Sequence, residues 1–314
     1  MSNISREHRF YSISSYLKEE MGSKIVKLAI DGGFTCPNRD GSKGSGGCVF
    51  CSASGSGDMA SDIPSQIRLL SGKWPNAKYL AYFQSHTNTY APVSQLCRQY
   101  EEALSYPGVV GLAVATRPDC LPEDVLDLLS EINEKTFLWV ELGLQTIHED
   151  TARLMNRCYP LSVYDQAVSD LTRRGIRVVT HLIFGLPGET RRQMLDSVKY
   201  VCQDSQALNA AAESAYDSSR HIFGIKLHML NLVRGSQMER LYPDYVSFAS
   251  IEEYVDLVVS ALEIIPPDIT IHRLSADAPR PTLISPEWSY KKRTILNSIH
   301  KALRERDTFQ GAKL

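Results

Sequence analysis

Strand-like and helix-like runs alternate along almost the whole chain, and this alternation most restricts the folds that are possible. The strand-like runs are dense in apolar residues, which is typical of parallel strands covered on both faces. We expect strands at 24–31, 79–83, 109–115, 136–142, 176–184 and 222–230, and a further one at 268–274. Repeated strand–helix units predict an α/β fold with right-handed crossovers, either a barrel or an open doubly wound sheet.

Local signals mark helix ends and an insertion. Pro122 and two acidic residues predict the start of a helix, the segment 187–190 predicts another start, and Gly175 predicts an end. The Ala- and Ser-rich segment 203–220 precedes the sixth strand, so we expect a surface insertion away from the active-site end of the sheet. No repeat or linker is evident. We therefore predict one domain over 1–314, with an N-terminal helix (1–23), a barrel core (24–275) and a C-terminal helical extension (276–314).

The composition excludes several classes of protein. The 314 residues are 43% hydrophobic and 22% charged, enough to bury a sizeable core. A net charge of −2 argues against binding nucleic acid through overall positive charge, although local basic patches are compatible with it. The N-terminus is too polar for a signal peptide, and the apolar stretch 254–267 is too short and charged to cross a membrane. We therefore expect a cytoplasmic protein with reduced thiols and no membrane partner.

Three of the seven cysteines, Cys36, Cys48 and Cys51, lie close together after the first predicted strand. Structural zinc would need a fourth ligand. No Cys or His follows at a suitable local spacing, and His86 would have to fold back to serve as one. A redox Cys-x-x-Cys pair leaves Cys36 unused. A [4Fe–4S] cluster usually has four thiolates, so three indicate one iron open to a small ligand. The spacing leaves all three alternatives open. The other cysteines, Cys97, Cys120, Cys158 and Cys202, are expected to be packing residues.

The residues around the cysteines extend the interpretation. Asp31-Gly-Gly-Phe-Thr-Cys36-Pro-Asn-Arg-Asp-Gly41 and Gly47-Cys48-Val-Phe-Cys51 resemble the cluster loop of the radical S-adenosylmethionine superfamily, YtqA/YhcC-type branch. Further matching blocks follow in order at 83–92, 115–119, 141–145, 181–190, 226–228, 272–273, 286–288 and 310–311. The resemblance implies a partial (β/α)6 TIM-like barrel with extra terminal helices. It also implies a [4Fe–4S] cluster and S-adenosylmethionine, whose reductive cleavage gives a 5′-deoxyadenosyl radical.

The same resemblance implies roles for individual residues. Cys36, Cys48 and Cys51 would hold the cluster. The implied cofactor-binding residues are Gln84, His86, Asn88, Thr116, Arg117, Glu141, Gln145, His181 and Gly185, of which Glu141, Gln145 and His181 are also candidates for catalysis. His181 is equally compatible with a hydrogen-bonded core histidine, and Gly185 with a simple turn before a helix. Glu141 is harder to explain structurally, because a carboxylate in an apolar strand needs partners.

The substrate is implied by similarity alone. The blocks at 141–145 and 185–188 are also similar to the radical domain of the Elongator catalytic subunit, which modifies wobble uridine in tRNA. The leading hypothesis is conversion of 5-carboxymethylaminomethyl-uridine towards 5-aminomethyl-uridine in tRNA, with an electron donor such as flavodoxin or ferredoxin. Basic residues around 291–306, with Trp288 and Tyr290, are compatible with an RNA contact or with a solvated helix. A small metabolite, a protein side chain, or a non-enzymatic metal-stabilised binding module remain alternatives. Relatives would have Gly-His where this chain has Cys158-Tyr159.

Overall fold

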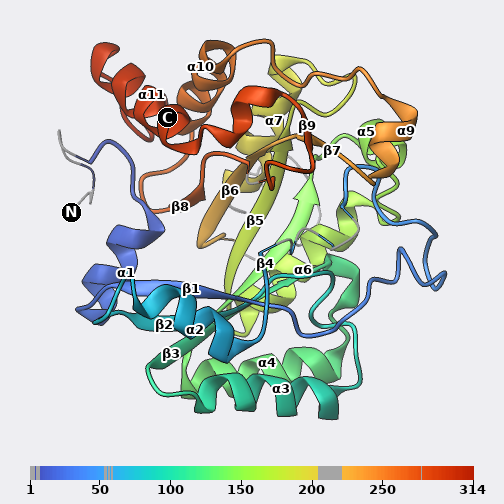
Figure 1. The fold of residues 1–314 in the computed structure, drawn as a ribbon, viewed down its shortest axis with the longest axis vertical. Helices are drawn as coiled ribbons and strands as arrows, with labels where there is room; N and C mark the ends of the chain where they lie inside the picture. Colours follow the sequence, from blue (N-terminus) through green and yellow to red (C-terminus); the bar gives the residue numbers. More distant parts are fainter. Residues whose placement is uncertain are drawn as a thin grey trace, which may run out of the picture.

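The computed structural model describes residues 4, 8–52, 55, 57, 59–203, 221–276 and 278–314. Its main element is a sheet of seven parallel strands in the order β1-β2-β3-β4-β5-β6-β8, which curls into a half-barrel (Figure 1). The strands are β1 Ile25–Ile30, β2 Lys78–Phe83, β3 Val109–Thr116, β4 Phe137–Gln145, β5 Arg177–Phe184, β6 Gly224–Met229 and β8 Thr270–Arg273. The predicted partial barrel is confirmed, and the segment expected at 268–274 supplies the seventh strand.

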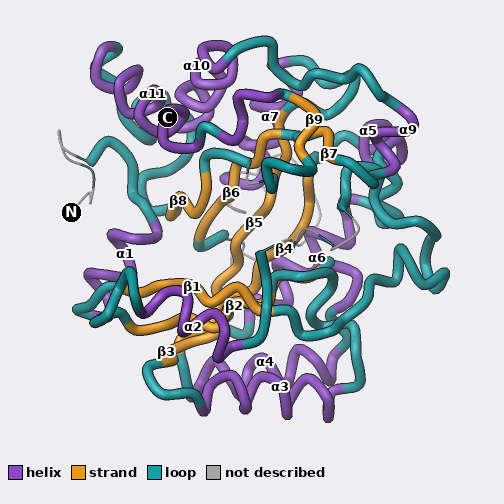
Figure 2. Tube along the Cα trace, in the orientation of Figure 1, coloured by secondary structure: helices purple, strands orange, loops and turns teal. Residues whose placement is uncertain are grey.

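Helices cover the outer face of the curled sheet (Figure 2). These are α2 Ile63–Ser71, α3 Val93–Ser105, α4 Glu123–Lys135, α6 Leu161–Arg173, α7 Arg191–Cys202, α10 Ile251–Leu262 and α11 Lys292–Glu305. The other described helices are α1 Ile13–Met21, α5 Glu149–Leu154 and α9 Gln237–Leu241, with short 3₁₀ turns at Pro118–Cys120 and Glu287–Tyr290. A small antiparallel pair, β7 Leu232–Val233 and β9 Leu283–Ser285, lies with α5 and α9 beyond the carboxyl end of β4 (Figure 1).

The predicted helix boundaries are present. Helix α4 begins directly after Pro122, with acidic residues in its first turn where they favour the helix dipole. Thr190 and Gln193 form a reciprocal capping box at the start of α7, which satisfies backbone donors that the helix itself leaves unpaired. Gly175 follows α6 at φ +68°, a conformation that side chains with a Cβ disfavour. Of the predicted insertion at 203–220, residues 204–220 lie outside the described residues.

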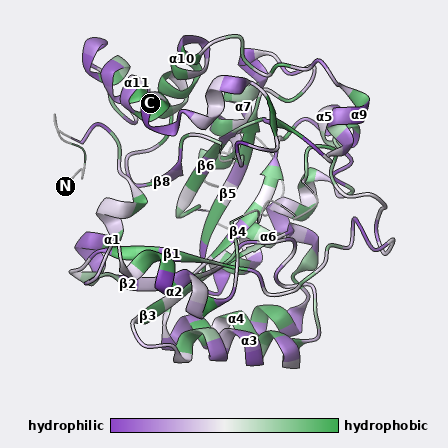
Figure 3. Ribbon diagram, viewed as in Figure 1, coloured by the Kyte–Doolittle hydropathy of each residue, from purple (hydrophilic) through white to green (hydrophobic). Residues whose placement is uncertain are grey.

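Successive residues of a strand pack alternately into two hydrophobic cores, one on each face of the sheet. On β2, Ala81 and Phe83 belong to the large core between sheet and helices, whereas Leu80 and Tyr82 belong to a smaller core inside the barrel. Leu17 of α1 packs on this inner core and closes the amino end of the barrel. Figure 3 shows the strands as predominantly hydrophobic and the covering helices as hydrophobic on one side only. The carboxyl half of the interior is therefore the part left for polar side chains.

The large core runs without interruption from Leu28 of β1 to Leu303 of α11, and we propose that the chain is one domain. None of the helices in the described part of the chain combines the length and apolar character that a membrane span requires.

Gln310 ties the two ends of the chain to the barrel. Its side chain is fully buried, accepts a hydrogen bond from the Tyr11 backbone N–H (2.8 Å) and donates to the carbonyls of Pro266 (2.6 Å) and Ile269 (2.8 Å). Gln310→Ala is expected to lower the free energy of unfolding by about 2–4 kcal/mol, because buried partners lose their hydrogen bonds. Urea denaturation measures this loss. The adjacent, exposed Phe309→Ala is the control and should change stability by less than about 0.5 kcal/mol; equal effects would contradict the account.

Candidate active site

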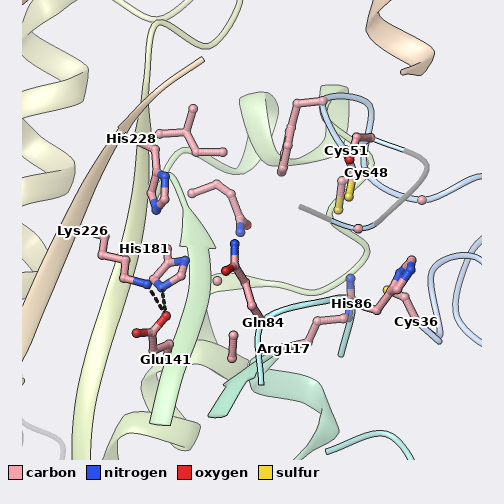
Figure 4. A pocket seen from close by; sticks show the side chains of 18 of the residues that line it. Cys36, Cys48, Cys51, Gln84, His86, Arg117, Glu141, His181, Lys226 and His228 are labelled. Carbon is pink, nitrogen blue, oxygen red and sulfur yellow. Dashed lines mark hydrogen bonds and ion pairs between the residues drawn. The ribbon is translucent and has the colours of Figure 1, made fainter. Parts of the chain in front are cut away.

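One cavity of about 270 Å³ collects most of the residues predicted to be functional (Figure 4). It opens at the carboxyl ends of the strands, where parallel sheets place their active sites. The predicted residues that line it are Cys36, Cys48, Cys51, Gln84, His86, Thr116, Arg117, Glu141, Gln145 and His181. Asn88 and Gly185 do not line it. The Asn88 amide instead donates to the Ala115 carbonyl (2.7 Å) from a fully buried position, and the Gly185 carbonyl accepts from the Tyr245 hydroxyl (2.8 Å).

The three predicted cysteine ligands lie on the loop that follows β1. A turn brings Cys51 back towards Cys48, with the Cys51 N–H donating to the Cys48 carbonyl at 2.9 Å. The Asn38 amide donates to the Cys48 sulfur at 3.6 Å, and burial raises the pKa of the Cys48 thiol to about 12. Within the described residues, no three His, Cys, Asp or Glu side chains converge closely enough for a single metal ion. A multi-iron cluster is bound differently, because each thiolate binds its own iron.

The cysteine loop is anchored to the segment after β4. Val49 is buried with Met155, and their backbones pair through the Val49 N–H and the Met155 carbonyl (3.0 Å). The Asn156 amide donates to the Gly47 carbonyl at 2.8 Å. The prediction that Cys158 is a packing residue is wrong: its side chain is exposed, because a positive φ (63°) turns it outwards beside the loop.

Strained backbone lies at the cavity wall. His86 (φ 61°) and Gln145 (φ 68°) both line the cavity in a left-handed conformation that costs a non-glycine residue about 1–3 kcal/mol. Gly55 allows His86 this position, since a Cβ on Gly55 would come within 2.4 Å of the imidazole. The His86 Nδ1 atom is buried and has no hydrogen-bond partner within the part of the chain that the structure describes. Such strain and unsatisfied polarity are typical of residues kept for binding rather than for stability.

A buried ionic network fills the base of the cavity. Glu141 is fully buried. Its Oε2 atom accepts hydrogen bonds from the Tyr82 hydroxyl (2.7 Å) and from His181 Nε2 (2.9 Å), and it forms an ion pair with Lys226. Its Oε1 accepts from the Trp139 indole (2.9 Å). Figure 4 shows Lys226 and His181 converging on this carboxylate. The carboxylate is saturated with donors, so it fixes its neighbours in place.

The charges of this network follow from its contacts. Burial alone would raise the pKa of Glu141, but Lys226 and His181 outweigh it and hold that pKa well below the usual range. Burial, together with repulsion from Lys226, lowers the pKa of His181 to about 4. Burial and the charge of His181 likewise lower the pKa of His228, whose ring lies 5.1 Å from that of His181. At neutral pH the site therefore contains an ionised Glu141 beside neutral imidazoles.

This arrangement predicts a pH-dependent stability. Between pH 6.5 and about 4 the unfolded chain binds a proton at residue 181 that the folded protein does not, so stability falls as the pH drops through this range. The shift at His181 lowers the free energy of unfolding by about 3 kcal/mol when the pH has fallen to about 4. Urea denaturation between pH 7.5 and 4.5 should show this loss, and His181→Gln should reduce the slope. The exposed His221→Gln is the control; an unchanged slope in His181→Gln would contradict the assignment.

A second charged group forms the opposite wall. Arg117 makes a two-pronged ion pair with Asp119, both contacts at 2.9 Å, and its guanidinium lies 5.0 Å from the ring centre of Tyr159. The Arg157 guanidinium lies 4.8 Å from the centre of the same ring and donates to the carbonyls of Leu144 and Thr146. Tyr159 thus joins two arginines of the cavity wall, which gives the Cys158-Tyr159 departure a structural role.

Four further residues that were not predicted as site residues also line the cavity: Tyr82, Lys226, His228 and Arg273. The position of Lys226 could have been recognised from the sequence, because a lysine inside an apolar strand, like Glu141, needs a buried partner. Tyr82 carried none, because a tyrosine in a strand is more often a packing residue.

Comparison with known proteins agrees with this geometry. A model of the radical SAM superfamily matches residues 36–201, and a model of the radical SAM C-terminal domain matches residues 222–305. The uncharacterised protein YtqA of Bacillus subtilis is 44% identical over 97% of this chain and 92% of its own length. Protein YhcC of Escherichia coli K12 is 38% identical over 95% of this chain and 93% of its own length. The resemblance stated from the sequence is thereby confirmed.

The fold is shared with a solved structure. The archaeal Methanocaldococcus infernus Elp3, with its N-terminus deleted, superposes with a TM-score of 0.66 over 92% of this chain and 64% of that chain, at 16% identity. At this level of identity the likeness concerns the fold alone. It supports the partial barrel.

Proposed function

Because this chain belongs to the radical S-adenosylmethionine superfamily, we propose that its barrel cavity modifies the wobble-uridine side chain of a tRNA, converting 5-carboxymethylaminomethyl-uridine towards 5-aminomethyl-uridine. Enzymes of this superfamily use a [4Fe–4S] cluster and S-adenosylmethionine, and these are the cofactors of the chain. Together they supply a 5′-deoxyadenosyl radical that abstracts hydrogen from a substrate. The observation that carries the proposal is the convergence of a three-cysteine loop and the carboxyl ends of the strands on one cavity.

The residues of the cysteine loop fit a cluster. Cys36, Cys48 and Cys51 offer three sulfur ligands at one cavity, one fewer than the four irons of the cluster. The Asn38 amide already points a donor at the Cys48 sulfur, as donors around such clusters do. The burial that disfavours an ionised Cys48 in the free protein also keeps water from a metal-bound thiolate. We propose that these three cysteines bind the cluster and leave one iron for S-adenosylmethionine.

The other residues of the cavity bind, orient and exclude water. Arg117, fixed by Asp119 and Tyr159, lines the cavity and offers donors to a carboxylate. Thr116 lines it as well, with its hydroxyl hydrogen-bonded to that of Thr89. Gln84, His86 and Gln145 offer polar atoms along the walls. Glu141 holds His181 and Lys226 in one geometry, so we assign it a positioning role at the base of the cavity. Val233 of β7, together with Ala276 and Ala278 from the segment between β8 and β9, adds apolar lining to the cavity.

An exposed surface around Tyr290 supports an RNA substrate. Tyr290 is 41% exposed, and the Arg280 guanidinium lies 4.4 Å from its ring centre, a combination on which an RNA base can stack. Lys291, Arg293 and Arg304 are exposed nearby in the sequence and offer phosphate contacts. Trp288 does not share this role, because it packs against the core beside Tyr254. We further propose that the enzyme works in the cytoplasm and receives electrons from a donor such as flavodoxin or ferredoxin.

The test is a change in a tRNA nucleoside. Anaerobic, reconstituted enzyme is incubated with S-adenosylmethionine, a reductant and tRNA carrying 5-carboxymethylaminomethyl-uridine, and the digested nucleosides are separated by chromatography and weighed by mass spectrometry. The proposal predicts loss of that nucleoside and appearance of 5-aminomethyl-uridine. Unchanged tRNA, with 5′-deoxyadenosine still formed, would overturn the tRNA substrate and favour a small metabolite or a protein side chain.

A further inference from the structure

The charges around the cavity are unequal. Its described lining contains one carboxylate, Glu141, and five cationic side chains: Arg39, Arg117, Arg157, Lys226 and Arg273. Lys226 is paired with Glu141 inside the cavity, Arg117 with Asp119 behind its wall, and Arg157 with Glu149. Arg39 lies at the cysteine loop, where it donates to the Ser52 carbonyl. Arg273 adds positive charge at the other edge of the half-barrel, because β8 and β1 are the two ends of the sheet. This end of the cavity favours an anionic ligand.

The strand register directs Arg273 towards the base of the cavity. His181 is the Cα partner of Lys226 on β6. Lys226 is in turn the Cα partner of Arg273 on β8, because the register between these strands shifts after Ile225 and skips His272. Partners in neighbouring parallel strands present their side chains on the same face of a sheet. The three side chains therefore form a row across the concave face, and all three line the cavity. Glu141 already binds the first two, and Arg273 is the member of the row furthest from Glu141 in the strand order.

Two polar atoms at the end of β6 complete the site. His228 Nε2 and Asn231 Oδ1 are both buried at the cavity, and neither has a hydrogen-bond partner among the described residues. A neutral imidazole can donate from this nitrogen, and an amide oxygen can only accept. Leaving such atoms unpaired costs about 1–3 kcal/mol each, which a ligand with matching groups would recover. A ligand that fits this arrangement therefore has a hydrogen-bond acceptor near Arg273 and His228 and a hydrogen-bond donor near Asn231.

We propose that Arg273, His228 and Asn231 form a subsite for an N-substituted glycine group of the substrate. The carboxylate of that group receives hydrogen bonds from Arg273 and His228, and its secondary ammonium donates to Asn231 Oδ1. This assignment rests on the proposed function, since the 5-carboxymethylaminomethyl side chain of a wobble uridine ends in this group. It goes further by naming the residues that recognise the group.

The test uses small probes, so that it does not depend on tRNA or on radical chemistry. The reconstituted protein carries ¹³C-labelled histidine, and the His228 resonance is assigned from its absence in His228→Gln. The titrants are N-methylglycine, its neutral amide N-methylglycinamide, acetate and inorganic phosphate. We expect N-methylglycine to shift the His228 resonance saturably and to bind about tenfold more tightly than N-methylglycinamide, because the amide lacks the charged acceptor. Acetate should bind more weakly than N-methylglycine, since it cannot donate to Asn231.

Variants then locate the effect. Arg273→Gln should weaken N-methylglycine binding about tenfold or more, and Arg273→Lys should retain part of the affinity. The exposed Arg192→Gln is the matched control and should bind as the wild type does. Thermal melting checks that each variant is folded; if Arg273→Gln is not, the comparison of the acid with its amide on the wild type and on Arg273→Lys decides.

Each outcome bears on one proposal. No shift of His228 by N-methylglycine, equal affinity for acid and amide, or undiminished binding by the folded Arg273→Gln would overturn the subsite. Binding of phosphate but not of either carboxylate would also overturn it. Binding of N-methylglycine through Arg273 by an enzyme that leaves the tRNA unchanged would instead overturn the tRNA function and leave the subsite in place.

Discussion

Replacing Lys226 by methionine is expected to lower the free energy of unfolding by about 3–5 kcal/mol, one of the largest losses available to a single substitution in this chain. The reason is the carboxylate that remains. Glu141 is fully buried, and methionine fills the space of the lysine stem without supplying the positive charge. Tyr82, His181 and Trp139 still donate to Glu141, but all three are neutral there. Urea denaturation followed by circular dichroism measures the loss.

Two comparisons make this result specific. Lys301→Met removes an exposed cation paired with Glu305 at 3.7 Å and should cost less than about 1 kcal/mol. The double variant Glu141→Gln with Lys226→Met should be more stable than Lys226→Met alone, because no uncompensated charge is left in the core. A loss below about 1 kcal/mol for Lys226→Met, or a double variant that is simply the sum of the singles, would contradict the buried ion pair.

The second large effect concerns the cysteine loop. Alanine at Cys36, at Cys48 or at Cys51 is expected to remove most of the iron and sulfide that the wild type takes up on anaerobic reconstitution, because a cluster held by three thiolates cannot lose one without becoming labile. Iron and sulfide analysis, with the visible absorbance of the cluster, measures the loss.

The matched control for these variants is Cys158→Ala. Cys158 is an exposed cysteine beside the same loop, and a Cβ on Gly44 of that loop would come within 2.9 Å of its sulfur. It should reconstitute like the wild type. Iron retained in full by one of the three loop variants would remove that residue from the ligand set. Iron lost in Cys158→Ala would mean a fourth thiolate and no iron open to the cofactor.

Much of the fold was predictable because its signals are local. The strands are apolar runs bounded by turns, and the caps at Pro122, Thr190 and Gly175 act within one helical turn. The cysteine spacing and the neighbouring motifs likewise lie within short segments, and most of the predicted site residues line one cavity because each follows the end of a parallel strand.

The remainder depends on contacts between distant segments. The Glu141–Lys226 pair joins β4 to β6, and recognising it requires the order and register of the strands. Asn88 stands in a block that resembles a cofactor-binding motif, yet its side chain is fully buried and donates a hydrogen bond to the Ala115 carbonyl. Cys158 points outwards because of a local positive φ, which nothing in its residue type indicates. Side-chain direction, more than position in the chain, was the information missing from the sequence.

The central claim is that this cavity cleaves S-adenosylmethionine by radical chemistry with a cluster held by the cysteine loop. The most direct test is to reduce the anaerobically reconstituted wild type with dithionite, add S-adenosylmethionine, and follow 5′-deoxyadenosine by chromatography. The account predicts continuous formation of 5′-deoxyadenosine by the wild type and by Cys158→Ala, and none by Cys36→Ala, Cys48→Ala or Cys51→Ala. A fully reconstituted wild type that forms no 5′-deoxyadenosine, or a protein that holds tight zinc in place of iron and sulfide, would contradict it.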